Sequence, residues 1–514
     1  MRNEMQATPL TDVAIIGAGP IGLTLSNLLS RQGIDHIVFE AHPGLSVHPK
    51  ARGVSARSME ILRGLGLEAD VRAAGLPAEH VRFYRGRDLV DPDFLRSGPA
   101  PADLVTSNTP SPGLICSQDT LEPVLLLHAR QAGGDVRFGV RALRLRSDED
   151  GVTIELASRD GVAMGEVRAR FVVGCDGGAS TVREQSGIHM SGDVGLGHYL
   201  SVRFEASLGA VVADRASASY FLTGDGRGGF LAIDNQTKWI YQYPLDPEKV
   251  DVEDLRTNTA ALEELVRAAA GISDLDVDIQ DTMVWRMDAR LADSYRRGRV
   301  LLAGDAAHLT PPTGGHGMNV GIGDVDNLAW RLAAVVRGEA DESFLDQYEA
   351  ERRPIGERVI EISTDNSRKS YSIDDELLLN TNYGAGEALR AESFRVSAEV
   401  GRRLPHIPLT TDGSPTSTLD LIDGRFTLLT HRPSATWAAA TDALTGEYPG
   451  LHHASVTTPS RAEAMSGSWA RATKLEPKAA LLIRPDGHIA ARLHGADPLQ
   501  EAREAMSAAH RIAV

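Results

Sequence analysis

The residues best suited to chemistry are a glycine-rich run near the start of the chain and an aspartate far along it. Residues 17–22 read GAGPIG and follow an apolar run, residues 12–16, that has the composition of a buried strand. In a strand–turn–helix unit, Gly17 would make the tight turn, Gly19 would let the backbone approach a pyrophosphate, and Gly22 would allow close helix packing. The run therefore predicts a dinucleotide-binding turn with the anion at the helix N-terminus.

Glu40 supports the same prediction. Apolar residues recur at helical spacing after the turn, up to Gly33, and residues 36–40 then supply a second strand that ends at Glu40. An acid about 20 residues past the turn is where the hydroxyls of an adenosine ribose would donate hydrogen bonds. The alternative is that Glu40 merely ends a strand at the surface.

Two later strand ends also carry acids. Residues 171–183 indicate a buried strand, a turn at Asp176-Gly177 and a helix, and ligands of open α/β sheets gather at such strand ends. Residues 298–308 read GRVLLAGDAAH and contain Gly304-Asp305. Together with the N-terminal turn, this pair suggests a dinucleotide cofactor that is bound at two points. Asp305 would bind the part of the cofactor that leads to its reactive ring. Such a cofactor would be FAD.

Composition bounds the class of protein. The 514 residues exceed one ordinary domain core, so two or three domains are expected. A net charge of -17 disfavours nucleic acid and anionic membrane as partners, and no run approaches the roughly 18 apolar residues of a membrane span. Cys116 and Cys175 form no CxxC pair and fit neither a disulfide framework nor a zinc site. We expect a cytoplasmic protein without a metal.

A second glycine-rich run, residues 224–229, also fits GxGxxG. It lies between two strand-like runs, residues 219–222 and 230–233, and no helix follows it. A β-hairpin turn explains these glycines better than a second dinucleotide-binding unit. A nicotinamide cosubstrate therefore lacks a visible domain of its own.

The combination of motifs resembles the single-component FAD-dependent aromatic hydroxylases, the family of 4-hydroxybenzoate hydroxylase, phenol hydroxylase and the polyketide hydroxylases. The resemblance rests on residues 17–22 with Glu40, the Asp176-Gly177 turn with Arg183, and Gly304-Asp305 with the PPTG run at 311–314, and it spans roughly residues 10–365.

This resemblance implies an α/β fold in several parts. A discontinuous Rossmann-like FAD-binding domain would take residues 1–184 and, with further helices, 286–400. An antiparallel-sheet substrate domain would take residues 185–285, and a thioredoxin-like domain without CxxC would take residues 401–514. The polar run at residues 410–418 suits a linker.

The resemblance also implies the residues that bind the cofactor. Asp305 would hydrogen-bond the ribitol hydroxyls, and the backbone from Pro312 to Asn319 would pass beside the isoalloxazine. Arg52 matches an arginine near the flavin and Gln118 a polar residue beside it, although either side chain could be a solvated one. The expected set is Gly17, Gly19, Pro20, Gly22, Glu40, Arg52, Gln118, Asp176, Asp305, Pro312, Gly317, Met318 and Asn319.

Several neighbouring residues are expected to be structural. Apolar residues from Val325 to Val335 recur at helical spacing and predict a helix whose positive N-terminal end would face the flavin. His308 is expected to be a hydrogen-bonded scaffold residue rather than an acid–base catalyst. Arg57 and Glu60 are expected to be charges on a helix surface.

The substrate is less defined. Residues 239–243 alternate as in an antiparallel sheet with one covered face, which in the family roofs the substrate. Where 4-hydroxybenzoate hydroxylases have Arg-Tyr-Tyr, this chain has Lys238-Trp239-Ile240, which disfavours a benzoate. The group that activates the substrate is not identified, and Tyr241, Tyr220 and His80 are no better than guesses.

The expected reaction follows from the family. NADH or NADPH would reduce FAD, O2 would add at the flavin C4a, and the resulting hydroperoxide would hydroxylate a phenol or a polycyclic, polyketide-like aromatic. A homodimer is one candidate assembly. The alternatives are Baeyer–Villiger oxygen insertion or epoxidation on the same scaffold, a non-oxygenating flavin reductase, and a protein that uses FAD structurally or as a redox sensor.

Overall fold

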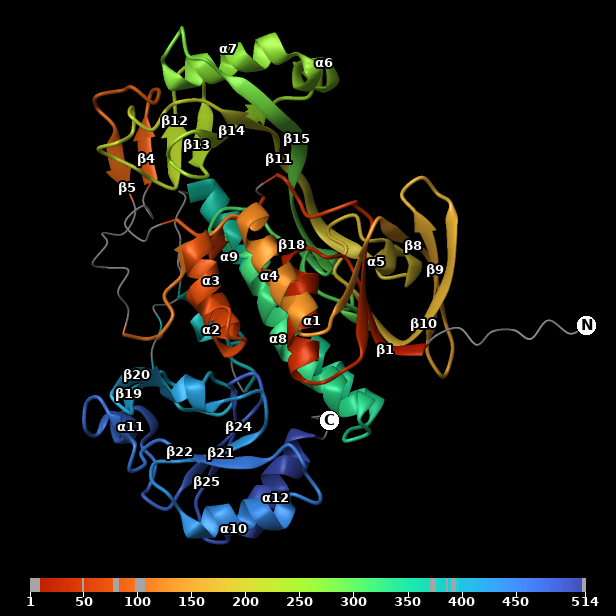
Figure 1. The fold of residues 1–514 in the computed structure, drawn as a ribbon, viewed down its shortest axis with the longest axis vertical. Coiled ribbons are helices and arrows are strands. Elements are labelled where there is room, and N and C mark those ends of the chain that lie inside the picture. Colours follow the sequence, from red (N-terminus) through yellow and green to blue (C-terminus); the bar gives the residue numbers. More distant parts are fainter. Residues whose placement is uncertain are drawn as a thin grey trace, which may run out of the picture.

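The computed structural model describes residues 10–48, 50–76, 83–97, 107–369, 376–384, 387–389, 394 and 396–510. These residues form three regions, which lie from top to bottom in Figure 1: an antiparallel sheet, a central α/β unit and a smaller C-terminal α/β unit. The expected α/β fold class, with these three kinds of region, is confirmed. Among the described residues, no helix combines the length and apolar character needed to cross a membrane.

The central unit is built on a mainly parallel sheet. Its parallel strands have the order β17-β10-β1-β2-β7, and α1 (Pro20–Arg31) connects β1 to β2 as the glycine-rich run predicts. Residues 13–16 of β1 are all buried, as expected for a strand covered on both faces. The strands are β1 (Leu10–Ile16), β2 (His36–Glu40), β7 (Asp135–Phe138), β8 (Val140–Ser147), β9 (Val152–Ser158), β10 (Ala163–Gly174), β16 (Arg296–Arg297) and β17 (Val300–Leu302).

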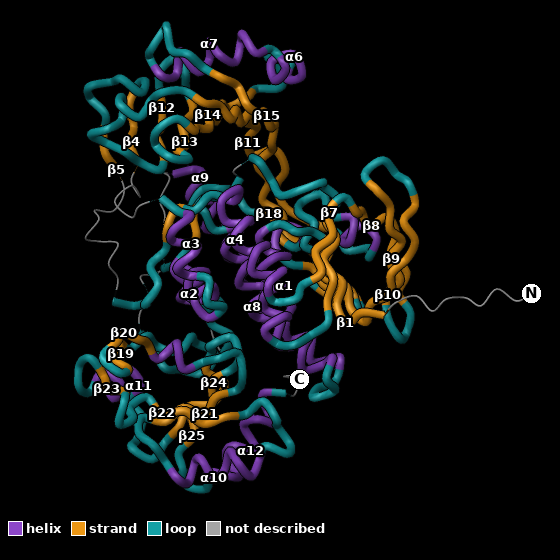
Figure 2. Tube along the Cα trace, in the orientation of Figure 1, coloured by secondary structure: helices purple, strands orange, loops and turns teal. Residues whose placement is uncertain are grey.

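Helices pack together beside this sheet (Figure 2). The helix α8 (Gly317–Val336) contacts α1 and is buried along most of its length, because neighbouring helices and the C-terminal unit surround it. It ends at Val336, one residue after the last apolar residue of the predicted helical pattern, Val335. The other helices and short strands here are α2 (Ala56–Gly64), α3 (Glu68–Ala74), α4 (Gln118–Gln131), α5 (Thr181–Gln185), α9 (Asp346–Lys369), β3 (Gly53–Val54) and β6 (Leu114–Ile115).

The second sheet has the order β18-β15-β11-β14-β13-β12-β4-β5, and all its pairings are antiparallel except β12 with β4. One face packs on α7 (Thr259–Ala270), next to α6 (Val252–Thr257). Residues 223–227 join β12 to β13, and Gly228 and Gly229 begin β13, so the hairpin prediction is confirmed. The strands are β4 (Phe83–Gly86), β5 (Leu95–Ser97), β11 (Met190–Glu205), β12 (Ser219–Leu222), β13 (Gly228–Ala232), β14 (Lys238–Leu245), β15 (Asp278–Ala292) and β18 (His308–Leu309).

The C-terminal unit has a four-stranded sheet of order β22-β21-β24-β25, in which only the pair β21–β22 is parallel. Its elements are β21 (Thr427–Thr430), α10 (Ala435–Leu444), β22 (His452–Ser455), β23 (Arg461–Glu463), α11 (Ser468–Thr473), β24 (Ala480–Ile483), β25 (Ile489–Leu493) and α12 (Pro498–Ala509).

The linker expected at residues 410–418 is wrong. β19 (Pro408–Thr411) and β20 (Ser414–Ser417) pair antiparallel here, and β23 joins them. Asp412 and Gly413 have φ values of 48° and 81°, and positive φ at both central positions is the conformation of a tight hairpin turn that matches strand twist. The threonines beside the turn are β-branched and favour strands, so the polar composition marks a hairpin and not a spacer.

Candidate functional site

The glycine-rich turn has the packing that its sequence predicts. Gly17 has a φ of 107°, and a Cβ there would lie 2.3 Å from the carbonyl oxygen of Cys175. A Cβ on Gly22 would lie 1.9 Å from the carbonyl oxygen of Gly17. By contrast, the nearest atom to a Cβ on Gly19 would be Glu122 Oε1 at 4.0 Å. Two glycines therefore close the turn, and the third leaves the backbone accessible to a ligand.

Glu40 holds this turn from the end of β2. Its Oε2 accepts a hydrogen bond from the backbone N–H of Ala18 at 2.8 Å, and its Oε1 accepts one from the backbone N–H of His42 at 2.8 Å. The side chain is 14% exposed, so a ligand can still reach it. A contact between Glu40 and a ribose stays a prediction, because carboxylate oxygens have lone pairs beyond these two bonds.

Asp305 is the exposed residue of an otherwise buried segment. Gly304, Ala306 and His308 on either side of it are buried. Gly304 has a φ of 63°, and a Cβ there would lie 2.9 Å from Ile21 at the start of α1. The turn therefore packs directly on the helix that follows the glycine-rich run and presents the Asp305 carboxylate outward. This arrangement fits a ligand that extends from the glycine-rich run to the Gly304-Asp305 turn and has hydroxyl groups beside Asp305.

A buried ion pair fixes that turn. His308 Nε2 lies 2.7 Å from Asp324 Oδ2, and Arg352 Nε donates to Asp324 Oδ1 at 2.9 Å. Asp324 Oδ2 also accepts from the backbone N–H of Gly304 at 3.1 Å. Burial alone would raise the pKa of Asp324, but the charges of His308 and Arg352 outweigh burial and lower it. His308 thus makes the scaffold contacts expected of it. Asp324 and Arg352 were not predicted, since helical spacing alone does not show which charges are paired inside.

Asn319 fixes the segment before α8. Its Oδ1 accepts from the backbone N–H of Ser55 at 2.9 Å, and its Nδ2 donates to the carbonyls of Gly53 and Gly315 at 2.9 and 2.7 Å. One amide therefore links this segment to β3 and to the N-terminus of α2.

The remaining predicted residues of the segment lie at the start of α8. Pro312 is exposed, Gly317 begins α8, and Met318 is buried. No side chain among the described residues caps the N-terminus of α8, and its first turn contains no acid. Its free N–H groups and positive dipole end would favour negative charge on a ligand placed there.

Arg52 and Gln118 have different neighbours. Arg52 Nη1 donates to the carbonyl of Ala218 at 2.8 Å and Nη2 to the carbonyl of Ala232, so the guanidinium contacts the second sheet. Gln118 Nε2 donates to Glu122 Oε1 at 2.6 Å, the same oxygen that lies nearest Gly19. Glu122 was missed in the sequence, and burial raises its pKa. Gln118 therefore adjoins the glycine turn, whereas Arg52 joins the central unit to the sheet.

Asp176 caps a helix in this structure. Its Oδ1 accepts from Ser180 Oγ at 2.5 Å and its Oδ2 from the backbone N–H of Val182 at 3.1 Å, at the start of α5. On α5, Arg183 donates to the carbonyl of Ala306 at 3.2 Å, next to Asp305. The Asp176-Gly177 turn and Arg183 therefore support the turn that presents Asp305.

The expectation that Arg57 and Glu60 are surface charges is wrong. Their side chains are 12% and 2% exposed. Arg57 Nη2 donates to Asp326 Oδ2 on α8 and to the carbonyl of Asp486, both at 2.8 Å, and Arg403 lies 3.2 Å from Glu60 Oε1. The cause is tertiary: the turn between β24 and β25 packs over α2, which no pattern within α2 reveals.

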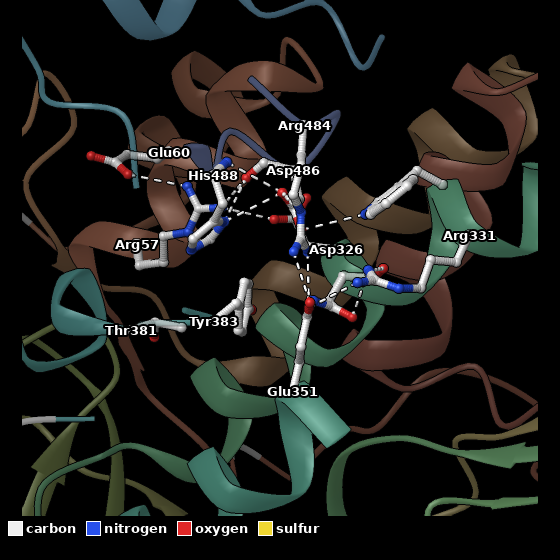
Figure 3. A network of polar contacts seen from close by, with 12 residues as sticks. Arg57, Glu60, Asp326, Arg331, Glu351, Thr381, Tyr383, Arg484, Asp486 and His488 are labelled. Carbon is white, nitrogen blue, oxygen red and sulfur yellow. Dashed lines mark hydrogen bonds and ion pairs between the residues drawn. The ribbon is translucent and has the colours of Figure 1, made fainter. Parts of the chain in front are cut away.

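These residues belong to a larger buried ion network (Figure 3). Arg484 donates to both carboxylate oxygens of Glu351, at 2.8 and 2.9 Å, and also pairs with Asp486. Arg331 on α8 donates to the same Glu351 at 2.8 Å. The network therefore joins the C-terminal unit to α2, α8 and α9.

The residues guessed to activate the substrate face elsewhere. Tyr220 and Tyr241 are fully buried on the α7 side of the second sheet. The Tyr220 hydroxyl donates to Asn235 Oδ1 at 2.9 Å, and the Tyr241 hydroxyl donates to the carbonyl of Arg227 at 3.0 Å. Burial raises the pKa of both phenols. His80 lies outside the described residues.

Comparison with known families covers almost the whole chain. Residues 10–363 match the model described as FAD binding domain, and residues 397–511 match the model described as aromatic-ring hydroxylase, C-terminal. A putative polyketide hydroxylase of Streptomyces halstedii is 34% identical over 534 aligned residues, which cover 95% of this chain and 94% of that protein.

Two solved structures are similar over their full length. The flavin-dependent monooxygenase PieE, in complex with FAD and substrate, superposes with a TM-score of 0.87 at 27% identity, covering 98% of this chain and 100% of that one. A ternary complex of aklavinone-11 hydroxylase with FAD and aklavinone superposes with a TM-score of 0.86 at 31% identity, with the same coverage of each chain. The likeness includes all three regions of the fold.

Proposed function

Because the chain belongs to the family of FAD-dependent aromatic polyketide hydroxylases, we propose that it uses NADH or NADPH and O2 to hydroxylate a polycyclic, polyketide-like phenol. One oxygen atom of O2 enters an aromatic C–H bond, the other leaves as water, and the nicotinamide with one proton supplies the two electrons. The observation that carries this proposal is the likeness of the entire chain, second sheet included, to a hydroxylase whose structure holds FAD and aklavinone.

The residues present fit FAD. The open backbone at Gly19 suits the pyrophosphate, Glu40 suits the adenosine ribose, and the exposed carboxylate of Asp305 suits the ribitol hydroxyls. The uncapped N-terminus of α8 suits the ring's pyrimidine edge. When bound, FAD takes up electrons from the nicotinamide and activates O2 for transfer to the substrate.

The protein's own residues position these groups and limit access of water. Arg52 ties the segment after Glu40 to carbonyls of β13 and of the residue before β12, so the sheet and the cofactor site keep a fixed separation. Asn319 fixes the segment before α8 through its hydrogen bonds to the carbonyls of Gly53 and Gly315. A closed boundary matters because water reaching activated oxygen would divert it from the substrate.

We also propose the division expected from the sequence, with FAD-binding residues 1–184 and 286–400, substrate residues 185–285 and a C-terminal unit at 401–514. Residues 83–97 would belong to the substrate part, because β4 and β5 lie in its sheet. The described chain has thiols only at Cys116 and Cys175, whose pKa values burial raises, so neither favours a reactive thiolate.

A substrate screen tests the proposal. Purified protein is mixed with FAD, NADH or NADPH, and a panel of phenols and polycyclic quinones, and both nicotinamide oxidation and products are recorded. We expect polycyclic compounds to stimulate oxidation and to gain a hydroxyl group. A lactone or epoxide would support the rival oxygenases, and oxidation without oxygen in the product would support a reductase.

A further inference from the structure

One face of the second sheet carries a set of side chains that have no assigned role in binding FAD or in the proposed reaction. Tyr199 pairs with Trp285 and Ser201 pairs with Gln242 across neighbouring strands, so all four share a face. Side chains alternate along a strand, and Tyr241 packs on the α7 side. The face with Gln242 is therefore the opposite one, toward the central unit, where His48 meets Ser201.

A continuous hydrogen-bonded chain runs across this face. Trp285 Nε1 donates to Gln242 Oε1 at 3.1 Å, and Gln242 Nε2 donates to Ser201 Oγ at 2.7 Å. Ser201 Oγ lies 2.8 Å from His48 Nε2, and His48 Nδ1 lies 3.3 Å from Asp281 Oδ2. Because the ionised Asp281 carboxylate can only accept, the proton of a neutral His48 lies on Nδ1, and Nε2 then accepts the hydrogen bond that the Ser201 hydroxyl donates.

The surroundings of His48 favour that arrangement. Burial lowers the pKa of His48, and Lys50 and Arg203 lower it further, while the hydrogen bond and charge of Asp281 act in the opposite direction. The neutral imidazole is the form whose Nε2 can accept a hydrogen bond from the Ser201 hydroxyl. The chain of donors therefore has one direction from Trp285 to Asp281.

Ser201, His48 and Asp281 have the residue types of a nucleophilic triad, but Ser201 cannot act as a nucleophile here. Its side chain is completely buried, and its oxygen already accepts from Gln242. A substrate carbonyl has no route to it. The chain instead fixes the orientation of the Gln242 amide, with Ser201 at its nitrogen and Trp285 at its oxygen.

Gln242 itself is partly exposed. Among the described residues its amide makes only these two side-chain bonds, so Nε2 keeps one N–H and Oε1 keeps one lone pair. Directly opposite on β13 is Gly229, which places no side chain over the amide. Beside it the rings of Tyr199 and Trp285 stack with centroids 4.4 Å apart at 15°.

The position of the amide also suits a substrate. On β15, Trp285 lies six positions before Leu291, which pairs with His308 in the segment that presents Asp305. These six residue steps of strand span about 20 Å. Gln242 therefore lies on the same face of the sheet as the His48 contact, and β15 continues from this face to the segment that presents Asp305.

We propose that Gln242 is a substrate-orienting residue that donates its free Nε2–H to a quinone or ketone carbonyl on a flat polycyclic aromatic. Ser201 and His48 act as positioning residues that hold the amide in this orientation. The inference rests on the proposed function and deepens it, because it selects carbonyl-bearing polycyclic phenols over phenols without a carbonyl. The aromatic pair Tyr199 and Trp285 adds a flat apolar surface beside the amide.

The test compares two probes that differ in the carbonyls, a hydroxyanthraquinone and the matching hydroxyanthracene. Dissociation constants are measured from quenching of tryptophan fluorescence, and KM from nicotinamide oxidation. We expect Gln242→Met to weaken hydroxyanthraquinone binding about tenfold, as for one lost hydrogen bond, and to change hydroxyanthracene binding little. Gln242→Glu, which keeps the size but loses the donor, should do the same. Ser201→Ala should lower the preference for the hydroxyanthraquinone over the hydroxyanthracene by a smaller factor.

Tyr241→Phe is the matched control, because it removes a hydroxyl from the same strand on the α7 side. It should leave the preference for the hydroxyanthraquinone unchanged. Equal losses for both probes in Gln242→Met, or an unchanged preference in both Gln242 variants, would overturn the inference while leaving the proposed function intact. If no compound of the substrate screen is oxygenated, the proposed function fails and the binding comparison still decides the role of Gln242.

Discussion

His308 Nε2 lies 2.7 Å from Asp324 Oδ2, and both side chains are fully excluded from solvent. The same carboxylate oxygen accepts from the backbone N–H of Gly304, so it joins helix α8 to the turn that presents Asp305. The position of the exposed Asp305 carboxylate, which we predict to bind FAD, therefore depends on this buried ion pair.

Replacing Asp324 with Asn tests that dependence. The change leaves Arg352 buried without its charged partner, so the free energy of unfolding should fall by about 3–5 kcal/mol and FAD should dissociate more readily. Denaturant unfolding and flavin fluorescence measure the two effects. Glu447→Gln removes an exposed partner of Arg503 and should cost less than about 1 kcal/mol. Similar losses in both variants would refute the buried clamp.

Asp305→Ala should separate binding from stability. Because Asp305 is exposed, its loss should change the unfolding free energy of the protein without FAD by no more than about 0.5 kcal/mol. Loss of hydrogen bonds to a charged group should weaken FAD binding by about tenfold to a hundredfold in a fluorescence titration. Asp293→Ala, at another exposed aspartate shortly before it in the chain, should leave the affinity unchanged. Unaltered FAD affinity in Asp305→Ala would refute its assigned role.

The C-terminal ion network should matter for the whole protein. Arg484→Met leaves Glu351 and Asp486 without their shared partner (Figure 3), so we expect a loss of about 3–5 kcal/mol in unfolding free energy. Thermal or denaturant unfolding measures it. Arg425→Met breaks an exposed pair with Asp423 in the same unit and should have little effect. If Arg484→Met is equally mild, the network does not hold the C-terminal unit in place.

His316, at the N-terminus of α8, should make the protein acid-sensitive. Burial lowers its pKa to about 4, against an ordinary value of about 6.5. The folded protein then binds fewer protons than the unfolded chain, so this contribution to stability is complete above pH about 6.5 and is lost as the pH falls toward about 4. The loss amounts to about 3 kcal/mol.

The variant His316→Asn should lose less stability than the wild type between these pH values. Denaturant unfolding at several pH values gives the free energy of unfolding of each protein. The slopes of this free energy against pH are then compared. His494→Asn, at an exposed histidine, should keep the wild-type slope. A His316→Asn slope as steep as that of the wild type would place the acid sensitivity elsewhere.

The parts of the site that follow from short sequence patterns could be predicted. Gly17, Gly22 and Gly304 have the positive φ or close packing that their motifs imply, because a turn's geometry is set by the residues within it. The helix α8 follows from its apolar spacing in the same way.

The rest depends on contacts between distant segments. Arg57 and Glu60 looked like surface charges, and the turn at residues 484–488 buries them. Alternation predicted the strand at 239–243, but only the sheet's packing on α7 shows that Tyr241 faces away from the central unit and Gln242 toward it. The pairing of Gln242 with Ser201 and His48 joins three segments, and no spacing within one of them encodes it.

Labelled oxygen tests the central claim most directly. The protein, reconstituted with FAD, is supplied with NADH or NADPH, the best polycyclic phenol from the screen, and 18O2, and the product is analysed by mass spectrometry. A hydroxylated aromatic product that carries one 18O atom, with the second atom recovered in water, is the predicted result. A product whose new oxygen comes from unlabelled water, or nicotinamide oxidation that never places 18O in the aromatic compound, would contradict it.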